Sequence, residues 1–227
     1  KLKVMRNLTM NKVMFSISAT VVSSLFVAST VSADFQGVSI DEIDSGMGIG
    51  TTYQVYVDVE AGDQVNAVFG DAVDLLSISG VDGAQLYQNP FGGATSQAIN
   101  AAFLPMFPSL EYDSFVTIGL TNSTGNNLLD IGIDFASFEA GGSLATDNGS
   151  WFATPDDAQV YEVDGRVLIG QFTLDGDVEG VINLQGKNAD LSNWDRRGVE
   201  FSSAIIPAPG AIALLGLAGL ASRRRRA

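Results

Sequence analysis

The sequence predicts an all-β fold, a single β-sandwich of jelly-roll-like or immunoglobulin-like type with about eight to twelve short strands. Three observations predict it. Apolar residues recur at every second position in several segments. Turn-forming Gly, Asp and Asn separate these segments. A helical repeat of apolar residues is found in one short segment only.

The alternating segments are expected to be strands with one buried face, because successive side chains of a strand point to opposite sides. Residues 129–135 alternate most cleanly, with Asp or Gly at every second position. The predicted strands cover residues 53–59, 115–121, 129–135, 167–173 and 181–185. The turn signals are Asp82-Gly83, Gly125-Asn126-Asn127, Asp164-Gly165 and Asp175-Gly176, and Asp-Gly between apolar runs is a strong hairpin signal.

The segment from Ser96 to Leu104 is the best helix candidate. Its apolar residues at positions 98, 99, 102 and 103 fit one face of a helix. Ser96 could cap the start of this helix, and Pro105 would end it.

The composition excludes several classes of enzyme and site. The 227 residues include no His and no Cys, which removes Ser-His-Asp triads, thiol nucleophiles, disulfides and ordinary zinc sites. Residues 34–206 carry four bases and 26 acids, a formal charge of −22. Such a body repels nucleic acid and anionic lipid, so no nucleic-acid partner is expected. The acids serve solubility, the favoured interpretation, or hold divalent cations.

Residues 34–206 are expected to form one domain. A chain of this length buries enough surface to be stable without disulfides, and no linker inside it indicates a second domain. Residues 1–33 and 207–227 are predicted to be targeting segments outside this fold.

The N-terminal segment has the pattern of a secretory signal peptide. Met10-Asn11-Lys12 supplies a positively charged start, although Met5 is an equally good initiator. An uncharged, mostly apolar run follows over residues 13–29, and Val31-Ser32-Ala33 fits a cleavage site between Ala33 and Asp34. The alternative is a membrane-spanning anchor, which usually needs about 20 apolar residues.

The C-terminal segment has three parts: two prolines, an apolar run and an arginine cluster. The 18 residues from Ala204 to Ala221 carry no charge, which makes them a transmembrane-helix candidate. The arginines favour the cytoplasmic side, so the acidic body would lie outside while the tail holds it transiently in the inner membrane. The motif residues are Pro207, Ala208, Pro209, Gly210, Arg223, Arg224, Arg225 and Arg226.

This tail resembles the PEP-CTERM sorting signal of Gram-negative bacteria over residues 207–227. Pro207 and Pro209 match the family motif, whereas Ala208 stands where the family usually has Glu. The resemblance implies processing by an exosortase, a membrane protease, and delivery to the cell surface or the extracellular matrix. It also implies association with exopolysaccharide or biofilm. The alternative is an ordinary C-terminal membrane anchor.

One acidic turn is a candidate calcium site. Alternate oxygen ligands followed by glycine suit a hard cation, but the twelfth position of such a loop is Gly186 instead of the required Glu. An exposed hairpin turn is therefore the favoured interpretation, and no other cofactor is expected. The candidate ligands are Asp175, Asp177 and Glu179. The turns at Asp156-Asp157 and Asp147-Asn148-Gly149 could also supply oxygen ligands.

The two tryptophans are candidates for a sugar-stacking platform. Trp151 and Trp194 could each offer an aromatic face to a sugar, but two tryptophans in a body of this size are more often core residues. The basic doublet Arg196-Arg197 could contact an acidic polysaccharide or neutralise nearby acids.

We therefore expect an exported, non-enzymatic surface or matrix protein. The alternative is a carbohydrate-binding module, with or without calcium. A glycosidase is a third hypothesis, since it needs only two carboxylates about 5 to 10 Å apart, but no pair among 26 acids stands out.

Overall fold

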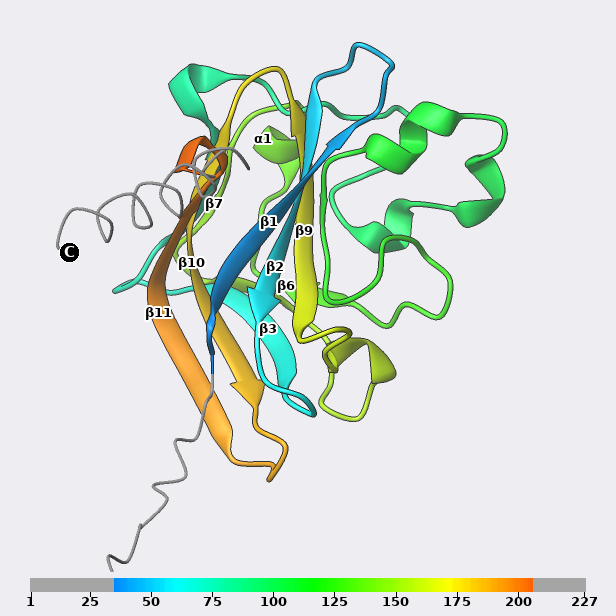
Figure 1. Cartoon of the computed structure of the whole chain (residues 1–227). Helices are drawn as coiled ribbons and strands as arrows, with labels where there is room; N and C mark the ends of the chain where they lie inside the picture. The colour runs from blue at the N-terminus through cyan, green and yellow to red at the C-terminus, as the bar shows by residue number, and fades with distance from the viewer. Residues whose placement is uncertain (1–34, 206–227) are drawn as a thin grey trace, which may run out of the picture. The chain divides into compact units, whose positions relative to one another are not determined.

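The computed structural model describes residues 35–205, and these residues form two antiparallel β-sheets with very little helix (Figure 1). The described region contains eleven strands and a single short α-helix, α1 (Ala136–Glu139). The predicted all-β class and the predicted number of strands are thus confirmed. The first sheet contains, in spatial order, β1 (Gly37–Asp44), β2 (Thr51–Asp58), β9 (Arg166–Leu174) and β5 (Phe115–Val116).

The second sheet is organised around β10 (Val178–Lys187). One side of β10 pairs with β11 (Asn193–Ser202) over its whole length. The other side pairs first with β4 (Leu76–Gly80) and then with β3 (Gln64–Gly70), so these two strands lie end to end. Beyond β4 lies β7 (Leu144–Thr146). Beyond β3 lie β8 (Gly149–Phe152) and then β6 (Leu129–Ile131).

One hydrophobic core joins the two sheets. The inward residues Val55 and Val57 of β2 belong to the same buried cluster as Ile182 and Leu184 of β10. The indole nitrogen of Trp151 donates a hydrogen bond across this core to the carbonyl of Thr117, at 3.1 Å.

Alternation predicts residues 53–58 of β2 well, because the inward residues there are buried and the outward residues are half-buried. It fails for β9, which is buried on both faces from Val167 to Leu174. The reason is tertiary cover: the outward Gln171 donates hydrogen bonds to the carbonyls of Glu111 and Asp113. The segment before β5 therefore shields a face that an isolated sheet would expose to water.

The prediction for residues 129–135 is wrong in its extent and in its buried face. The strand β6 covers only Leu129–Ile131, lies at the edge of its sheet and is exposed. Gly132 ends it with a positive φ of 71°, and a Cβ at this position would overlap the carbonyl oxygen of Asn148. The predicted strand 115–121 is likewise reduced to the two residues of β5.

The predicted helix over Ser96–Leu104 is also wrong. The chain makes two separate 3-10 turns, η2 (Ser96–Ala98) and η3 (Ala101–Phe103). Ser96 does not cap a helix, because its hydroxyl is hydrogen-bonded to the hydroxyl of Thr117. Ile99 alone among the four predicted face residues is buried. With no partner surface for a continuous apolar face, the segment folds around Ile99 instead.

The turn signals gave mixed results. Asp164-Gly165 forms the expected tight turn, with both residues at positive φ and reciprocal hydrogen bonds between Val163 and Arg166. Asp175-Gly176 is a turn, but it connects β9 in the first sheet to β10 in the second and so is not a hairpin. The predicted signal peptide and sorting tail, including Ala33, Asp34 and the motif from Pro207 to Arg226, lie outside the described residues.

Candidate functional site

A groove of about 610 Å³ lies beside the start of β9 and is the leading candidate site. This volume is in the range of small-molecule sites. The loop 119–127 forms one wall, and the turn 157–164 forms the other. Tyr56 from β2 and Arg166 from β9 close the end of the groove on the first sheet.

The two walls of the groove are held together by Gln159, a buried side chain. Its amide nitrogen donates to the carbonyl of Ile118 at 2.9 Å, and its amide oxygen accepts from the backbone N–H of Asn127 at 2.8 Å. Gly119 permits the close approach: its φ is 75°, and a Cβ there would overlap the carbonyl oxygen of Gln159. The groove is thus built into the fold and does not depend on a ligand for its shape.

The groove presents side chains that suit a ligand rich in hydroxyl groups. Tyr161 is 41% exposed and offers an aromatic face, while Thr121 and Thr124 add hydroxyls. The amide of Asn127 donates to Asp157 at 2.7 Å, which places a donor and an acceptor side by side. A sugar ring could stack on the tyrosine while its hydroxyls bond to the amide and the carboxylate.

The charges at the end of the groove are largely paired with each other. Arg166 makes a two-point contact with Asp41, at 3.0 and 2.6 Å, and its guanidinium carbon lies 3.9 Å from the centre of the Tyr56 ring. The hydrogen bond to Asp41 raises the pKa of Arg166 further. Hydrogen bonds from Asn127 and then Thr154 lower the pKa of Asp157, which keeps this carboxylate ionised as an acceptor.

Neither predicted tryptophan platform is present on the surface. Trp151 is 0% exposed and Trp194 is 5% exposed, so neither indole offers a face to a sugar. Trp151 packs in the common core, and Trp194 packs beside Gly186 and Phe35. Both are core residues, because each lies on the inward face of its strand.

The three candidate calcium ligands do not form a cluster. Asp175 and Glu179 are exposed, whereas Asp177 is half-buried and accepts a hydrogen bond from the hydroxyl of Ser203 at 2.8 Å. Across residues 35–205, no group of three or more acidic side chains has the arrangement of a metal site. Calcium binding at this turn stays a prediction.

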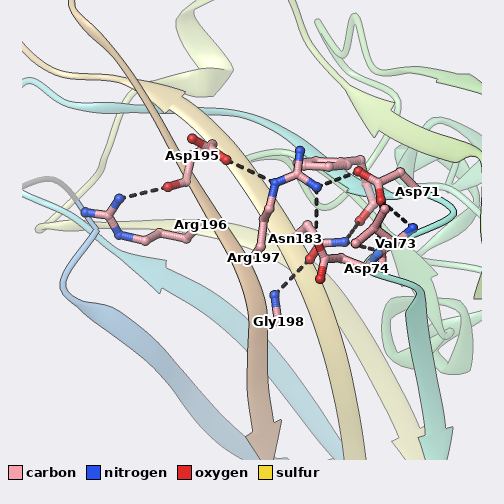
Figure 2. Close-up of polar contacts among 9 residues, drawn as sticks. Asp71, Val73, Asp74, Asn183, Asp195, Arg196, Arg197 and Gly198 are labelled. Atoms are coloured by element: carbon pink, nitrogen blue, oxygen red, sulfur yellow. Dashed lines mark hydrogen bonds and ion pairs between the residues drawn. The ribbon is translucent and has the colours of Figure 1, made fainter.

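The basic doublet lies on β11, where Arg197 neutralises acids of the same molecule (Figure 2). Its guanidinium forms ion pairs with Asp71, Asp74 and Asp195. The hydrogen bond from Arg197 lowers the pKa of Asp71 to about 2, and the pKa of Arg197 itself is raised. Arg196 donates to the carbonyl of Asp195 at 2.8 Å. Of the two hypotheses for this doublet, the geometry of Arg197 favours neutralisation.

The groove is not among the sites that the sequence predicts. Asp157 and Asn127 are predicted only as turn residues, and Tyr161 belongs to no site that the sequence predicts. These residues come from segments about 30 positions apart in the chain, and no spacing rule connects them. The weak signal was the presence of turn-forming residues on both walls.

The described residues contain no helix with the length and apolar character needed to cross a membrane. Comparison of the chain with protein-family models finds no match, and comparison with curated proteins and with solved structures finds no significant match.

Proposed function

We propose that this chain is an exported, non-enzymatic protein of the cell surface or extracellular matrix, and that its body binds exopolysaccharide. The groove beside β9 carries the binding proposal, because it combines an exposed tyrosine with an adjacent amide and carboxylate. Carbohydrate sites in general combine an aromatic face with a few positioned polar groups. The shared core of the two sheets supports a sandwich of jelly-roll-like or immunoglobulin-like type.

Two acids line the groove, Asp157 and Asp164, and the state of Asp157 favours binding over hydrolysis. A glycosidase needs one carboxyl that holds a proton near neutral pH, and such an acid usually has a raised pKa. The pKa of Asp157 is instead lowered by its hydrogen bonds. Burial raises the pKa of Asp113 to about 6, but this side chain is fully buried and does not line the groove.

Export and sorting rest on the two terminal segments. The resemblance of residues 207–227 to the PEP-CTERM signal supports processing by an exosortase and transient association with the inner membrane. Deleting residues 207–227 should change where the protein accumulates, measured by fractionating cells, membrane and medium. Unchanged surface delivery of the shortened protein would contradict the sorting proposal.

The binding proposal is tested by co-sedimentation of the full chain with polysaccharide from the producing cells. We expect Tyr161→Ala to weaken binding about fivefold or more, because it removes the stacking face. Asn127→Ala should also weaken it, because the donor beside Asp157 is lost. Val73→Ala is the matched control, since Val73 is exposed on the loop between β3 and β4 and does not line the groove.

The same experiment can reject the proposal. If the native protein does not sediment with the polysaccharide, the groove is not a carbohydrate site. If binding occurs but Tyr161→Ala binds as well as Val73→Ala, the site lies elsewhere on the molecule.

A further inference from the structure

We propose that the carbohydrate site continues from the groove onto an exposed apolar surface formed by Phe91, Phe103, Met106 and Phe107, and that its ligand is a long, uncharged polysaccharide. We call these four residues the aromatic knob. This inference rests on the proposed function of the groove and specifies its ligand.

Three of the four side chains of the aromatic knob are exposed, although all three are large and hydrophobic. Phe91 is 47% exposed, Phe103 is 37% exposed and Met106 is 64% exposed. Phe107 lies between the rings: its centroid is 4.0 Å from that of Phe91, which it stacks on, and 6.3 Å from that of Phe103. Large side chains gathered on the surface in this way indicate a contact surface.

The aromatic knob is held in place by a small core and by the buried Asp113. Phe107 packs against a small separate core formed by Ile99, Leu110 and Phe115. The loop that carries Phe91 is also fastened, because the buried carboxylate of Asp113 accepts the N–H of Asn89 at 2.6 Å and that of Gly93 at 3.1 Å. A ligand therefore meets a preformed surface, which lowers the entropic cost of binding.

The loop around Asp113 also explains a requirement for glycine next to Phe91. A Cβ at Gly92 would overlap the Oδ2 atom of Asp113. The chain therefore passes directly over the buried carboxylate, one residue after Phe91, whose ring stacks on Phe107.

The charges of the protein favour an uncharged ligand over an acidic one. No charged residue occurs from Gly83 to Leu110, although residues 34–206 as a whole carry a formal charge of −22. An acidic polysaccharide would be repelled by the body and would gain no ion pair at the knob. An uncharged polysaccharide can place the apolar faces of its sugar rings on the phenylalanines without an electrostatic cost.

The segment that leads to the aromatic knob adjoins one wall of the groove. The segment that leads to the knob is hydrogen-bonded to the groove wall: the carbonyl of Ile99 accepts from Ser123 at 2.9 Å, and Ser96 accepts from Asn126 at 2.7 Å. Ser123 lies between the groove residues Thr121 and Thr124. Figure 1 shows the two segments, both green, on the same side of the first sheet.

This arrangement predicts that the length of the ligand decides which part of the surface it uses. A short oligosaccharide fits in the groove alone, whereas a longer chain leaves the groove across residues 121–126 and reaches Phe103. The knob should then add affinity for long chains only.

The test uses extracellular polysaccharide from the producing cells, separated by anion exchange into uncharged and acidic fractions. Each fraction is studied intact and after partial acid hydrolysis to oligosaccharides. The variants of the full chain are Tyr161→Ala in the groove, the double variant Phe103→Ser with Met106→Ser in the knob, and the exposed control Val73→Ser. Phe107 is left unchanged because it packs on the small core.

We expect the native protein to bind the intact uncharged fraction more tightly than the acidic fraction. The knob variant should weaken binding of the intact uncharged polymer about fivefold and leave oligosaccharide binding unchanged. Tyr161→Ala should weaken binding of both ligands, and Val73→Ser neither. Unchanged thermal unfolding of the knob variant shows that its fold is retained.

Four results would overturn the inference. Equal binding of the intact polymer by the knob variant and the native protein would remove the knob while the groove proposal stands. Preference for the acidic fraction would reject the uncharged ligand. Sedimentation with phosphatidylcholine vesicles that depends on Phe103 and Met106 would assign the knob to a lipid surface. If neither the native protein nor any variant binds any fraction, the proposed function of the groove fails together with this inference.

Discussion

Asn183 on β10 should stabilise the second sheet more than the ion pairs that surround it. Its side chain is fully buried and makes three hydrogen bonds with the backbone (Figure 2). It donates to the carbonyls of Phe69 at 3.0 Å and Asp74 at 2.7 Å, and it accepts the N–H of Gly198 at 2.8 Å. One side chain thereby fastens the loop between β3 and β4 to the bend in β11.

The substitution Asn183→Ala leaves these three backbone groups without their partner. A buried polar group that loses its partner costs about 1 to 3 kcal/mol. The lower end applies here because water can reach the loop and the edge strand β11, so the total is about 3 kcal/mol. For a domain of this size, about 1 kcal/mol corresponds to roughly 2 to 4 °C, so the Tm should fall by about 6 to 12 °C.

The assay is urea unfolding of the full chain followed by tryptophan fluorescence. Trp151 and Trp194 are both buried, so their emission reports the loss of the core. Asn66→Ala is the matched control, because Asn66 is a half-buried asparagine on the neighbouring strand β3 with a single side-chain hydrogen bond, to Gln64 at 3.2 Å. The control should lose less than about 1 kcal/mol.

The comparison with Arg197→Ala can refute this reasoning. Arg197 has three ion pairs, but its side chain is 41% exposed, and exposed pairs contribute little because water screens them. We therefore expect Arg197→Ala to destabilise the protein much less than Asn183→Ala. If the order is reversed, or if Asn183→Ala matches Asn66→Ala, the backbone hydrogen bonds are not what holds this region.

Three further predictions concern single residues. Gly119→Ala should destabilise the protein by about 1 to 2 kcal/mol and weaken polysaccharide binding, because the position has positive φ and faces the Gln159 carbonyl. Native-like unfolding and binding would contradict this. Trp151→Phe should lower the free energy of unfolding in urea by about 2 to 3 kcal/mol, since the buried Thr117 carbonyl loses its donor. A loss below about 1 kcal/mol would show that this carbonyl finds another hydrogen-bond donor. Burial raises the pKa of Asp113 to about 6, so the contribution of this group to stability is complete below about pH 4 and is lost as the pH rises to 6. Asp113→Asn should abolish this part of the pH dependence of the unfolding free energy. An unchanged slope of the unfolding free energy against pH would show that the carboxyl titrates normally.

Local pattern predicted the strands whose environment is simple. Residues 53–59 alternate in sequence, and 53–58 lie in β2 (Thr51–Asp58), because one face of this strand packs on the core and the other stays partly open. The same rule failed for residues 129–135, where the alternation is cleaner. There the chain lies at the edge of a sheet, and Gly132 ends the strand after three residues. Alternation describes the two faces of a strand but does not say what covers them.

The groove could not be predicted because its parts are brought together only by folding. Tyr56 comes from β2, Asn127 from a loop and Tyr161 from a turn more than 30 residues later. The residue that unites them, Gln159, has no distinguishing feature in the sequence. The sequence makes the two tryptophans candidates for a sugar platform, yet their positions on inward faces make them core residues.

The all-β class, the acidity of the body and the lack of His and Cys chemistry can all be read from the amino-acid sequence, since they follow from composition and from near neighbours along the chain. The pairing of the strands, the acids that Arg197 neutralises and the aromatic residues that reach the surface depend instead on how distant segments pack together. Burial is a property of the whole packed molecule. The same Trp or Phe can serve as core or as a binding surface, depending on whether another segment covers it.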